Sequence, residues 1–177
     1  MANRPLPIDP LAEARRQWIA HGWTDAADGM AVVTSVMRAQ QLLLARVDAA
    51  LKPFRLTFAR YEVLRLLAFS RAGSLPLSSV VARLQVHPTS LSSTADRLVR
   101  DGLVLREPHP HDGRAALLTL TPAGRELADT ATRALNEQVF ARPGISSHDA
   151  SDLVSIVARL RKNAGDFADP RPTPDPL

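Results

Sequence analysis

Hydrophobic positions recur at helical spacing along most of this chain and change to strict alternation only once. Helical spacing predicts helices over residues 11–20 and about 27–51, a third helix from Thr57 to Gly73, one from Pro122 through Val139, and a last one after Ser146. Between them, residues 76–84 and 87–102 predict two shorter helices joined by a tight turn. Residues 103–121 alternate around the polar turn HPHDG and predict two β-strands. The pattern predicts a mainly α-helical protein with one small β-hairpin.

Prolines and short polar side chains mark the ends of these elements. Asp9-Pro10 and Thr121-Pro122 each place a side-chain acceptor before a proline at the first helical position. The proline-rich residues 1–8 and 169–177 predict segments without packed structure. We therefore expect N-terminal helices over 9–55, a helix-turn-helix with a hairpin over 56–121, and C-terminal helices over 122–168.

The flanking helices carry apolar stripes that a small central domain has little room to cover. The stripes are formed by Val33, Val36, Met37 and Leu44 in one helix, and by Leu153, Ile156, Val157 and Leu160 in the other. Either both helices fold back onto their own domain, or they pack against a second copy in a two-fold dimer. We favour the homodimer, so these flanking segments are predicted to be dimerisation helices.

Composition removes several classes of function. The chain has no cysteine, which excludes disulfides, thiolate nucleophiles and cysteine-ligated zinc. No apolar run approaches the ~20 residues that span a bilayer, and MANRPLPIDP lacks the apolar core of a signal peptide. No metalloprotease, nucleophile-elbow, P-loop or dinucleotide-binding motif is present. We expect a cytoplasmic protein that has no membrane-spanning segment and is not an enzyme.

Residues 76–121 carry the candidate chemistry. In a helix-turn-helix the second helix enters the major groove of double-stranded DNA, and a charged hairpin beside it can reach the minor groove. The helix over 88–101 begins at His87 and Pro88, where free backbone N–H groups favour a phosphate. Short hydroxyl side chains that can contact base edges follow: Thr89, Ser90, Ser92 and Ser93. The alternative is that these hydroxyls only form a solvated face. Leu91, Ala95, Leu98 and Val99 are at core spacing and are expected to anchor the helix.

The segment HPTSLSSTADRLVRDGLVLREPHPHDGRAALLTLTPAGR resembles the MarR family of bacterial transcription regulators. The resemblance covers about residues 30–162. It rests on the wing pattern Asp112, Arg114, Leu120 and Thr121, and on Asp96, Arg97 and Leu98 followed by Gly102 and Leu103. It implies a dimeric winged helix-turn-helix regulator that binds an inverted repeat and is often released by a small anionic or phenolic effector.

The resemblance also implies roles for three charged side chains. Arg97 is expected to pair with Asp112 in the wing or to reach a phosphate, unless it forms an ordinary surface ion pair. Arg114, in the wing over 106–116, is expected to enter the minor groove, where a narrow groove attracts a guanidinium group. The alternative function is a winged-helix module for protein–protein interaction without DNA binding, which predicts an apolar recognition surface.

Candidate ligand and metal sites are less defined. By resemblance, an effector pocket between the dimerisation helices and the DNA-binding lobe would be lined by Trp18, Arg38, Phe58 and Tyr61, all of which also suit a core or an interface. The urate-responsive branch of the family has an aspartate and an arginine where Glu62 and Thr94 stand here, so a urate response is not expected. His109 and His111 alone make an incomplete zinc site. We predict no metal and no cofactor.

Overall fold

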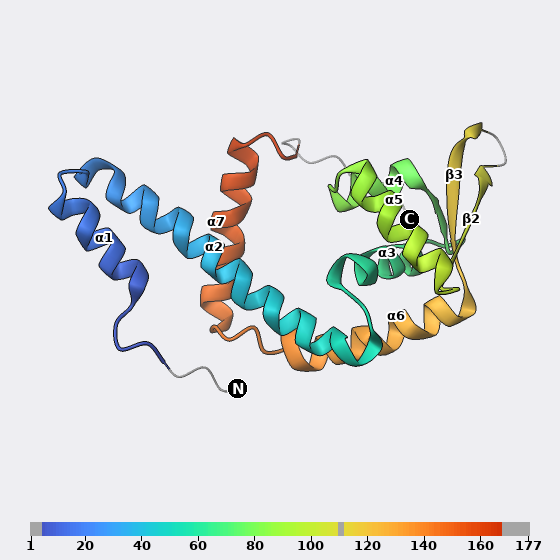
Figure 1. Cartoon of the computed structure of the whole chain (residues 1–177), viewed down its shortest axis with the longest axis horizontal. Coiled ribbons are helices and arrows are strands. Elements are labelled where there is room, and N and C mark those ends of the chain that lie inside the picture. Colours follow the sequence, from blue (N-terminus) through green and yellow to red (C-terminus); the bar gives the residue numbers. More distant parts are fainter. Residues whose placement is uncertain (1–4, 110–111, 168–177) are drawn as a thin grey trace. The chain divides into compact units, whose positions relative to one another are not determined.

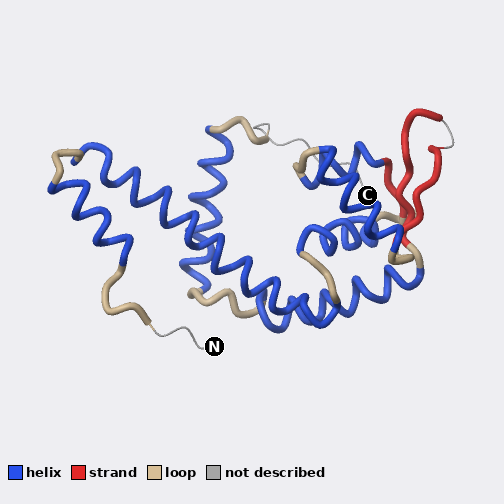
Figure 2. Tube along the Cα trace, viewed as in Figure 1, coloured by secondary structure: helices blue, strands red, loops and turns tan. Residues whose placement is uncertain are grey.

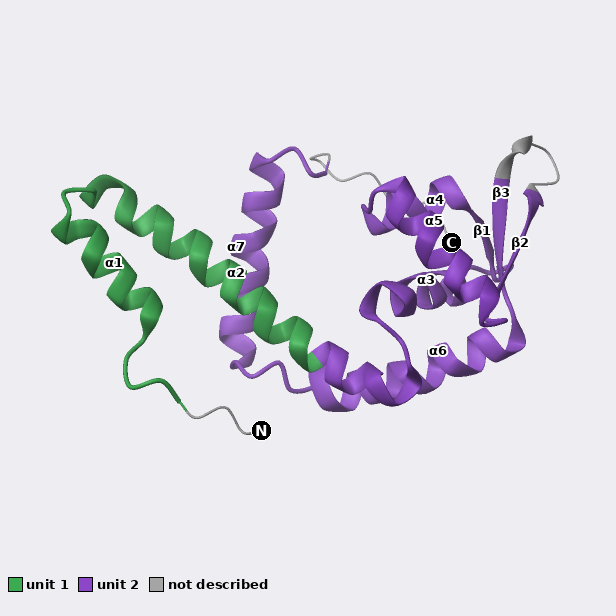
Figure 3. Cartoon of the chain, in the orientation of Figure 1, with its two compact units in different colours: residues 1–46 green, residues 47–177 purple. Residues whose placement is uncertain are grey.

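Helices form most of the chain, and one small antiparallel sheet is the only other regular structure among the described residues (Figure 2). The structure is a computed structural model that describes residues 5–109 and 112–167, with the backbone alone at 109 and 112–115. The predictions for residues 1–4 and 168–177 lie outside these ranges. The chain divides into two compact units at Arg46 and Val47, inside the second helix (Figure 3). The predicted mainly α-helical class is confirmed.

The first unit is a helical hairpin made of α1 (Pro10–Ala20) and most of α2 (Thr24–Leu51). Asp9 caps α1 as predicted, because its side chain accepts a hydrogen bond of 2.9 Å from the Leu11 amide. An ion pair of 2.7 Å joins Arg15 to Asp28 across the hairpin. Helix α2 begins three residues before the predicted Ala27, since its backbone becomes helical before its apolar stripe begins.

The second unit has a core made mainly of leucine, valine and alanine side chains. Helix α2 ends in a 3-10 turn at Lys52–Phe54, and α3 (Phe58–Phe69) follows under a cap from Thr57. Helix α3 stops four residues before the predicted Gly73, because the chain then turns into the sheet. Beside α3 lies α6 (Pro122–Leu135), where the hydroxyl groups of Tyr61 and Thr132 are 3.0 Å apart. Tyr61 is therefore part of this core.

The sheet has three strands in the order β1-β3-β2, one more than the predicted hairpin. Strands β2 (Val104–His109) and β3 (Asp112–Leu120) are the predicted pair. The additional strand β1 (Ser74–Pro76) pairs with β3 by placing Leu75 opposite Leu118. Three residues give no readable alternation, so only this long-range pairing makes the segment a strand.

The helix-turn-helix consists of α4 (Leu77–Leu84) and α5 (Pro88–Arg100) (Figure 1). Helix α5 buries one narrow stripe made of Leu91, Ala95 and Leu98. Val99 was predicted to belong to this stripe, and that prediction is wrong, since its side chain is 37% exposed. Neighbouring residues on a helix point about 100° apart, so the core that receives Leu98 leaves Val99 at its margin.

The C-terminal helices differ from each other in burial. The predicted helix through Val139 is present, but its last part is a π-helical turn at Asn136–Phe140 in which Val139 is buried. Helix α7 (Ser147–Asn163) is capped by Ser146, whose hydroxyl accepts a hydrogen bond of 3.1 Å from the Asp149 amide. No residue of α7 is buried.

Candidate nucleic-acid interface

The amino-terminal end of α5 is fixed by its own sequence. His87 precedes the helix in an extended conformation, and its Nδ1 atom accepts a hydrogen bond of 3.3 Å from the Thr89 amide. Pro88 occupies the first helical turn, where it needs no hydrogen-bond donor. Because Nδ1 is the acceptor, the neutral ring carries its proton on Nε2. His87 thus caps the helix and still has an exposed donor for a phosphate.

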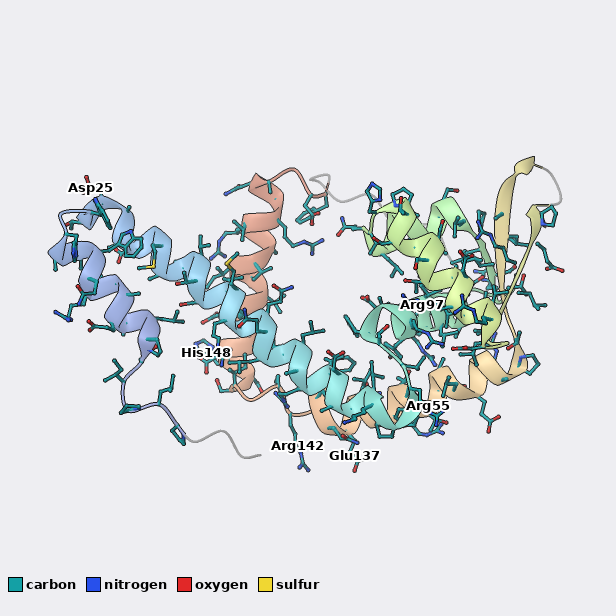
Figure 4. All side chains as sticks on the ribbon, in the orientation of Figure 1. Asp25, Arg55, Arg97, Glu137, Arg142 and His148 are labelled. Atoms are coloured by element: carbon teal, nitrogen blue, oxygen red, sulfur yellow. The ribbon has the colours of Figure 1, made fainter. Side chains whose placement is uncertain are left out.

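Most of the predicted recognition residues are exposed on α5 or at its start. His87, Pro88, Thr89, Ser90, Ser93 and Arg97 are all exposed, whereas Ser92 is half-buried. Figure 4 labels Arg97 on α5. The hydroxyl of Thr94 donates to the Ser90 carbonyl at 2.9 Å, so it is satisfied within the helix. The structure brings the exposed hydroxyls of Thr89, Ser90 and Ser93 onto one solvent-accessible face.

The carboxyl-terminal half of α5 is joined to its neighbours by charge pairs. Asp96 accepts a hydrogen bond of 2.9 Å from Arg106 of β2, which connects α5 to the hairpin. Asp101, directly after α5, pairs with Arg60 of α3. Sequence reasoning missed the pair between Asp96 and Arg106, although opposite charges ten residues apart on a helix and the following strand were a usable signal.

A threonine hydroxyl holds the junction between α5, the sheet and α6. The Thr121 hydroxyl lies 2.9 Å from the Gly102 carbonyl and 3.0 Å from the Leu103 carbonyl, and it accepts from the Gly124 amide at 3.0 Å. A β-carbon at Gly124 would lie 2.1 Å from the Leu103 carbonyl oxygen, so only glycine fits. This junction fixes the direction in which the chain leaves α5 for the hairpin.

The tip of the wing bears several of the predicted residues. Strands β2 and β3 pair regularly up to Pro108, and the register shifts between Pro108 and His109. The backbone of Asp112 and Arg114 belongs to β3. The side chains of these two residues and of His109, and the whole of His111, lie outside the described residues. The expected pairing of Arg97 with Asp112 and the zinc alternative at the two histidines fall there as well.

Arginine dominates the charge that surrounds α5. Arg83 on α4 and Arg97 and Arg100 on α5 are exposed, and none of them forms an ion pair with a residue that the structure describes. Two acidic residues of α5 and its carboxyl-terminal end, Asp96 and Asp101, each pair with an arginine. The exposed surface around the hydroxyl face of α5 is therefore positive, which favours a polyanion.

A cavity of about 50 Å³ lies behind α5. It is lined by side chains of α3, α4 and α5, which include Glu62 and Thr94, and otherwise mainly by apolar groups. Burial raises the pKa of the Glu62 carboxyl above its ordinary value. No cationic side chain lines this cavity, so the observed chemistry at Glu62 and Thr94 does not favour a urate-like anion there.

The four candidate effector residues are divided between the two units. Phe58 stacks on Tyr61 in α3 with ring centroids 6.2 Å apart, and the hydroxyl of Tyr61 is within hydrogen-bond distance of Thr132. In the first unit, Trp18 packs edge-to-face on Trp23, and Arg38 donates to Gln41 at 3.1 Å. The structure brings Phe58 and Tyr61 together. The effector site stays a prediction.

The described residues offer neither a membrane span nor a metal-ligand cluster. No helix among them is both long and apolar enough to span a membrane. No cluster of three or more potential metal ligands occurs within the same part of the chain. The helix-turn-helix and its hairpin are thus the strongest candidate site.

Similarity to known proteins supports the helix-turn-helix as the candidate site. Residues 56–115 match the model of the MarR family. ML2140 of Mycobacterium leprae, an HTH-type transcriptional regulator, is 32% identical over 95 residues, which cover 54% of this chain and 66% of that protein, just under two thirds of its length.

Two solved structures extend the similarity to most of the fold. The MarR family transcriptional regulator Sco5413 of Streptomyces coelicolor is 48% identical with a TM-score of 0.73, over 80% of this chain and 99% of its own. Sco3205 of the same organism, solved in complex with DNA, is 25% identical with a TM-score of 0.67, over 77% of this chain and 88% of its own. The wing pattern, the three-stranded winged helix and these matches together show that the chain belongs to the MarR family of transcription regulators.

Proposed function

We propose that this chain is a homodimeric, sequence-specific DNA-binding regulator that acts as a repressor on an inverted repeat. Helix α5 enters the major groove, and the β2–β3 hairpin reaches the adjacent minor groove. The observation that carries the proposal is the hydroxyl-rich face at the start of α5. The core leaves this face exposed, and exposed arginines surround it.

The chemistry of that face suits direct readout. Thr89, Ser90 and Ser93 have short side chains that let the helix backbone approach base edges, and each hydroxyl can donate or accept. The capped start of the helix presents N–H groups and the Nε2 atom of His87 to a phosphate, which would fix the register on the duplex. Sco3205, a relative with a similar fold, was solved in complex with DNA, which supports DNA binding by this chain.

Unpartnered apolar surface supports the homodimer. In the first unit, α2 exposes Val32, Val33, Val36, Met37 and Leu42, of which Val32 is 62% exposed. In the second unit, α7 exposes Leu153, Val154, Ile156 and Leu160. Monomeric proteins rarely expose continuous apolar stripes, and a two-fold partner can cover the same stripe on both copies.

The experiment that tests the proposal is selection of bound duplexes from a random DNA pool by the full chain. A palindrome with half-sites ~10 bp apart is the expected result, because equivalent helices of a two-fold dimer are one helical turn apart. Affinity for that palindrome should fall steeply with salt, with log K decreasing by ~0.9 for each phosphate contact neutralised. No enriched sequence would overturn the proposal and favour a winged-helix module that binds protein.

A small anionic or phenolic effector remains a prediction from the resemblance. Among its four candidate residues, only Phe58 and Tyr61 are in contact, and Tyr61 contributes to the core. Addition of salicylate to the purified protein and its selected palindrome tests the prediction directly. Release of DNA by salicylate, with a weaker response in Phe58→Ala, is the expected outcome.

A further inference from the structure

The end of α7 is hydrogen-bonded to the turn of the helix-turn-helix. Nε2 of Gln85 donates to Oδ1 of Asp166 at 3.1 Å and lies 3.4 Å from the carbonyl oxygen of the same residue. The two residues are 81 positions apart in the sequence, and both belong to the second unit. Neither residue was singled out by the sequence patterns. Their contact joins a flanking helix to the element that presents α5.

Gln85 occupies a constrained position in that turn. It ends α4 in a left-handed conformation, with φ 53° and ψ 42°, and its backbone N–H donates to the Val81 carbonyl. Only Val86 and His87 separate it from the first residue of α5. A displacement of the Gln85 side chain would therefore also move the amino-terminal end of α5, which begins three residues later.

Asp166 is held just as firmly to α7. Its Oδ2 atom accepts a hydrogen bond of 2.5 Å from Nε of Arg161, in the last turn of the helix. Its backbone N–H donates to the Arg161 carbonyl at 3.0 Å, after a turn at Gly165 with φ 72°. One carboxylate oxygen thus faces α7 and the other faces the helix-turn-helix. Asp166 is a bridge between Arg161 and Gln85.

This bridge matters because α7 is not held by burial in its own chain. No residue of α7 is buried, and Leu153, Val154, Ile156 and Leu160 are between 45% and 69% exposed. In the proposed dimer the partner covers that face and thereby sets the position of α7. A shift of α7 would then be transmitted through Arg161, Asp166 and Gln85 and would move the amino-terminal end of α5.

We infer that the bridge between Asp166 and Gln85 sets the spacing of half-sites that the dimer accepts. Both are positioning residues, and the inference rests on the proposed dimeric DNA-binding function. One added base pair between half-sites moves the second half-site by about 3.4 Å along the axis and turns it by about one tenth of a full rotation. A firm bridge makes the protein intolerant of that change, whereas a broken bridge lets each α5 adjust.

The test uses the full chain and the palindrome obtained by selection, with versions in which the half-sites are one base pair closer or one or two farther apart. Gln85→Glu replaces the donating amide with a carboxylate that faces Asp166 and breaks the bridge. Combining Gln85→Glu with Asp166→Asn exchanges the two groups: the asparagine amide can donate to the new carboxylate, and its oxygen can accept from Arg161. The double variant has the net charge of the wild type, so it controls for electrostatics.

The expected readout is the ratio of affinities for native and altered spacing, with dimer mass checked by sedimentation. Gln85→Glu should lower that ratio by about threefold or more, and the double variant should restore it. A residue with a purely structural role would change affinity for all spacings by the same factor, so an unchanged ratio overturns the inference. If the wild type selects no palindrome, the proposed function itself fails, which is a distinct result.

Discussion

Helices α5 and α7 of the second unit are both amphipathic, but only α5 has its apolar face buried. Helix α5 buries its apolar stripe of Leu91, Ala95 and Leu98 and leaves its polar face free. Helix α7 leaves its apolar stripe exposed and buries nothing. The apolar stripe of α5 is therefore covered within its own chain. The apolar side chains of α7 stay exposed in the isolated chain, and in the proposed dimer the partner would cover them. The comparison thus separates residues that stabilise the fold from residues proposed to serve association.

The two helices should differ most in the unfolding free energy that is lost when one leucine in each is truncated. Leu98→Ala removes a side chain with no exposed area and should cost about 2–5 kcal/mol of unfolding free energy. The matched control is Leu160→Ala, at a position that is 59% exposed in the isolated chain. Chemical denaturation at a concentration where the chain is monomeric measures both. Equal losses would show that α7 is packed in the monomer.

The junction between α5, the sheet and α6 can be tested at Gly124, where any side chain would overlap the Leu103 carbonyl. Gly124→Ala should destabilise the fold by about 1–3 kcal/mol, because backbone must shift to relieve the overlap. Gly29→Ala provides the control, since nothing lies within 4 Å of a β-carbon there and alanine favours a helix interior. Thermal unfolding should therefore move in opposite directions for the two variants.

Association through α7 should respond to a charge that folding tolerates. Leu160→Asp is expected to weaken the dimer by about tenfold or more, since an unpaired carboxylate would have to leave water at the interface. Sedimentation over a concentration series measures the change, while the circular dichroism of the monomer should stay that of the wild type. Ser155→Asp is a comparison variant, at an exposed polar position of the same helix. An unchanged dimer in Leu160→Asp would contradict the assignment of this face.

DNA binding should depend on the wing without involving either of these interfaces. Arg114→Ala is expected to weaken binding to the selected palindrome by more than about 1 kcal/mol and to leave dimerisation intact. Arg133→Ala removes the same charge from the exposed surface of α6 and serves as the control. Equal affinities of wild type and Arg114→Ala in a titration at moderate salt would eliminate the minor-groove role.

The smallest effect concerns Glu62, behind α5. Burial raises its pKa, so the folded state holds the proton more tightly than the unfolded chain does. The stabilising contribution of the protonated form is present below the unfolded pKa and is lost as pH rises through the higher folded pKa. Glu62→Gln should therefore raise stability at pH 7 by about 0.5 kcal/mol and change it less at pH 4. A larger gain at pH 4 than at pH 7 would contradict this sign.

Local chemistry was predictable from the sequence because it acts over a few residues. The caps at Asp9, Thr57, Thr121 and Ser146 all lie where the polar residues predicted them. The alternating segment became the hairpin, and the hydroxyls of α5 are mostly exposed. Periodicity shows which face of a helix is apolar, and it fixed the stripe of α5 except at Val99.

Long-range pairing was not predictable for the opposite reason. Strand β1 exists because Leu75 lies opposite Leu118, and three residues carry no pattern that shows this partner. The bridge from Gln85 to Asp166 joins residues 81 positions apart, so it depends on how elements pack in space. The π-helical turn at Asn136–Phe140 continues a helical pattern that periodicity alone cannot distinguish from an α-helix.

The separation of the two faces of α5 also has an evolutionary consequence. Thr89 and Ser93 are exposed, so replacing either one should leave the stability of the fold nearly unchanged. In the proposed DNA-binding function, single substitutions on this face would change the operator without a compensating change in the core. The same property makes the exposed face of α5 a suitable place to randomise when a regulator with a chosen DNA preference is wanted.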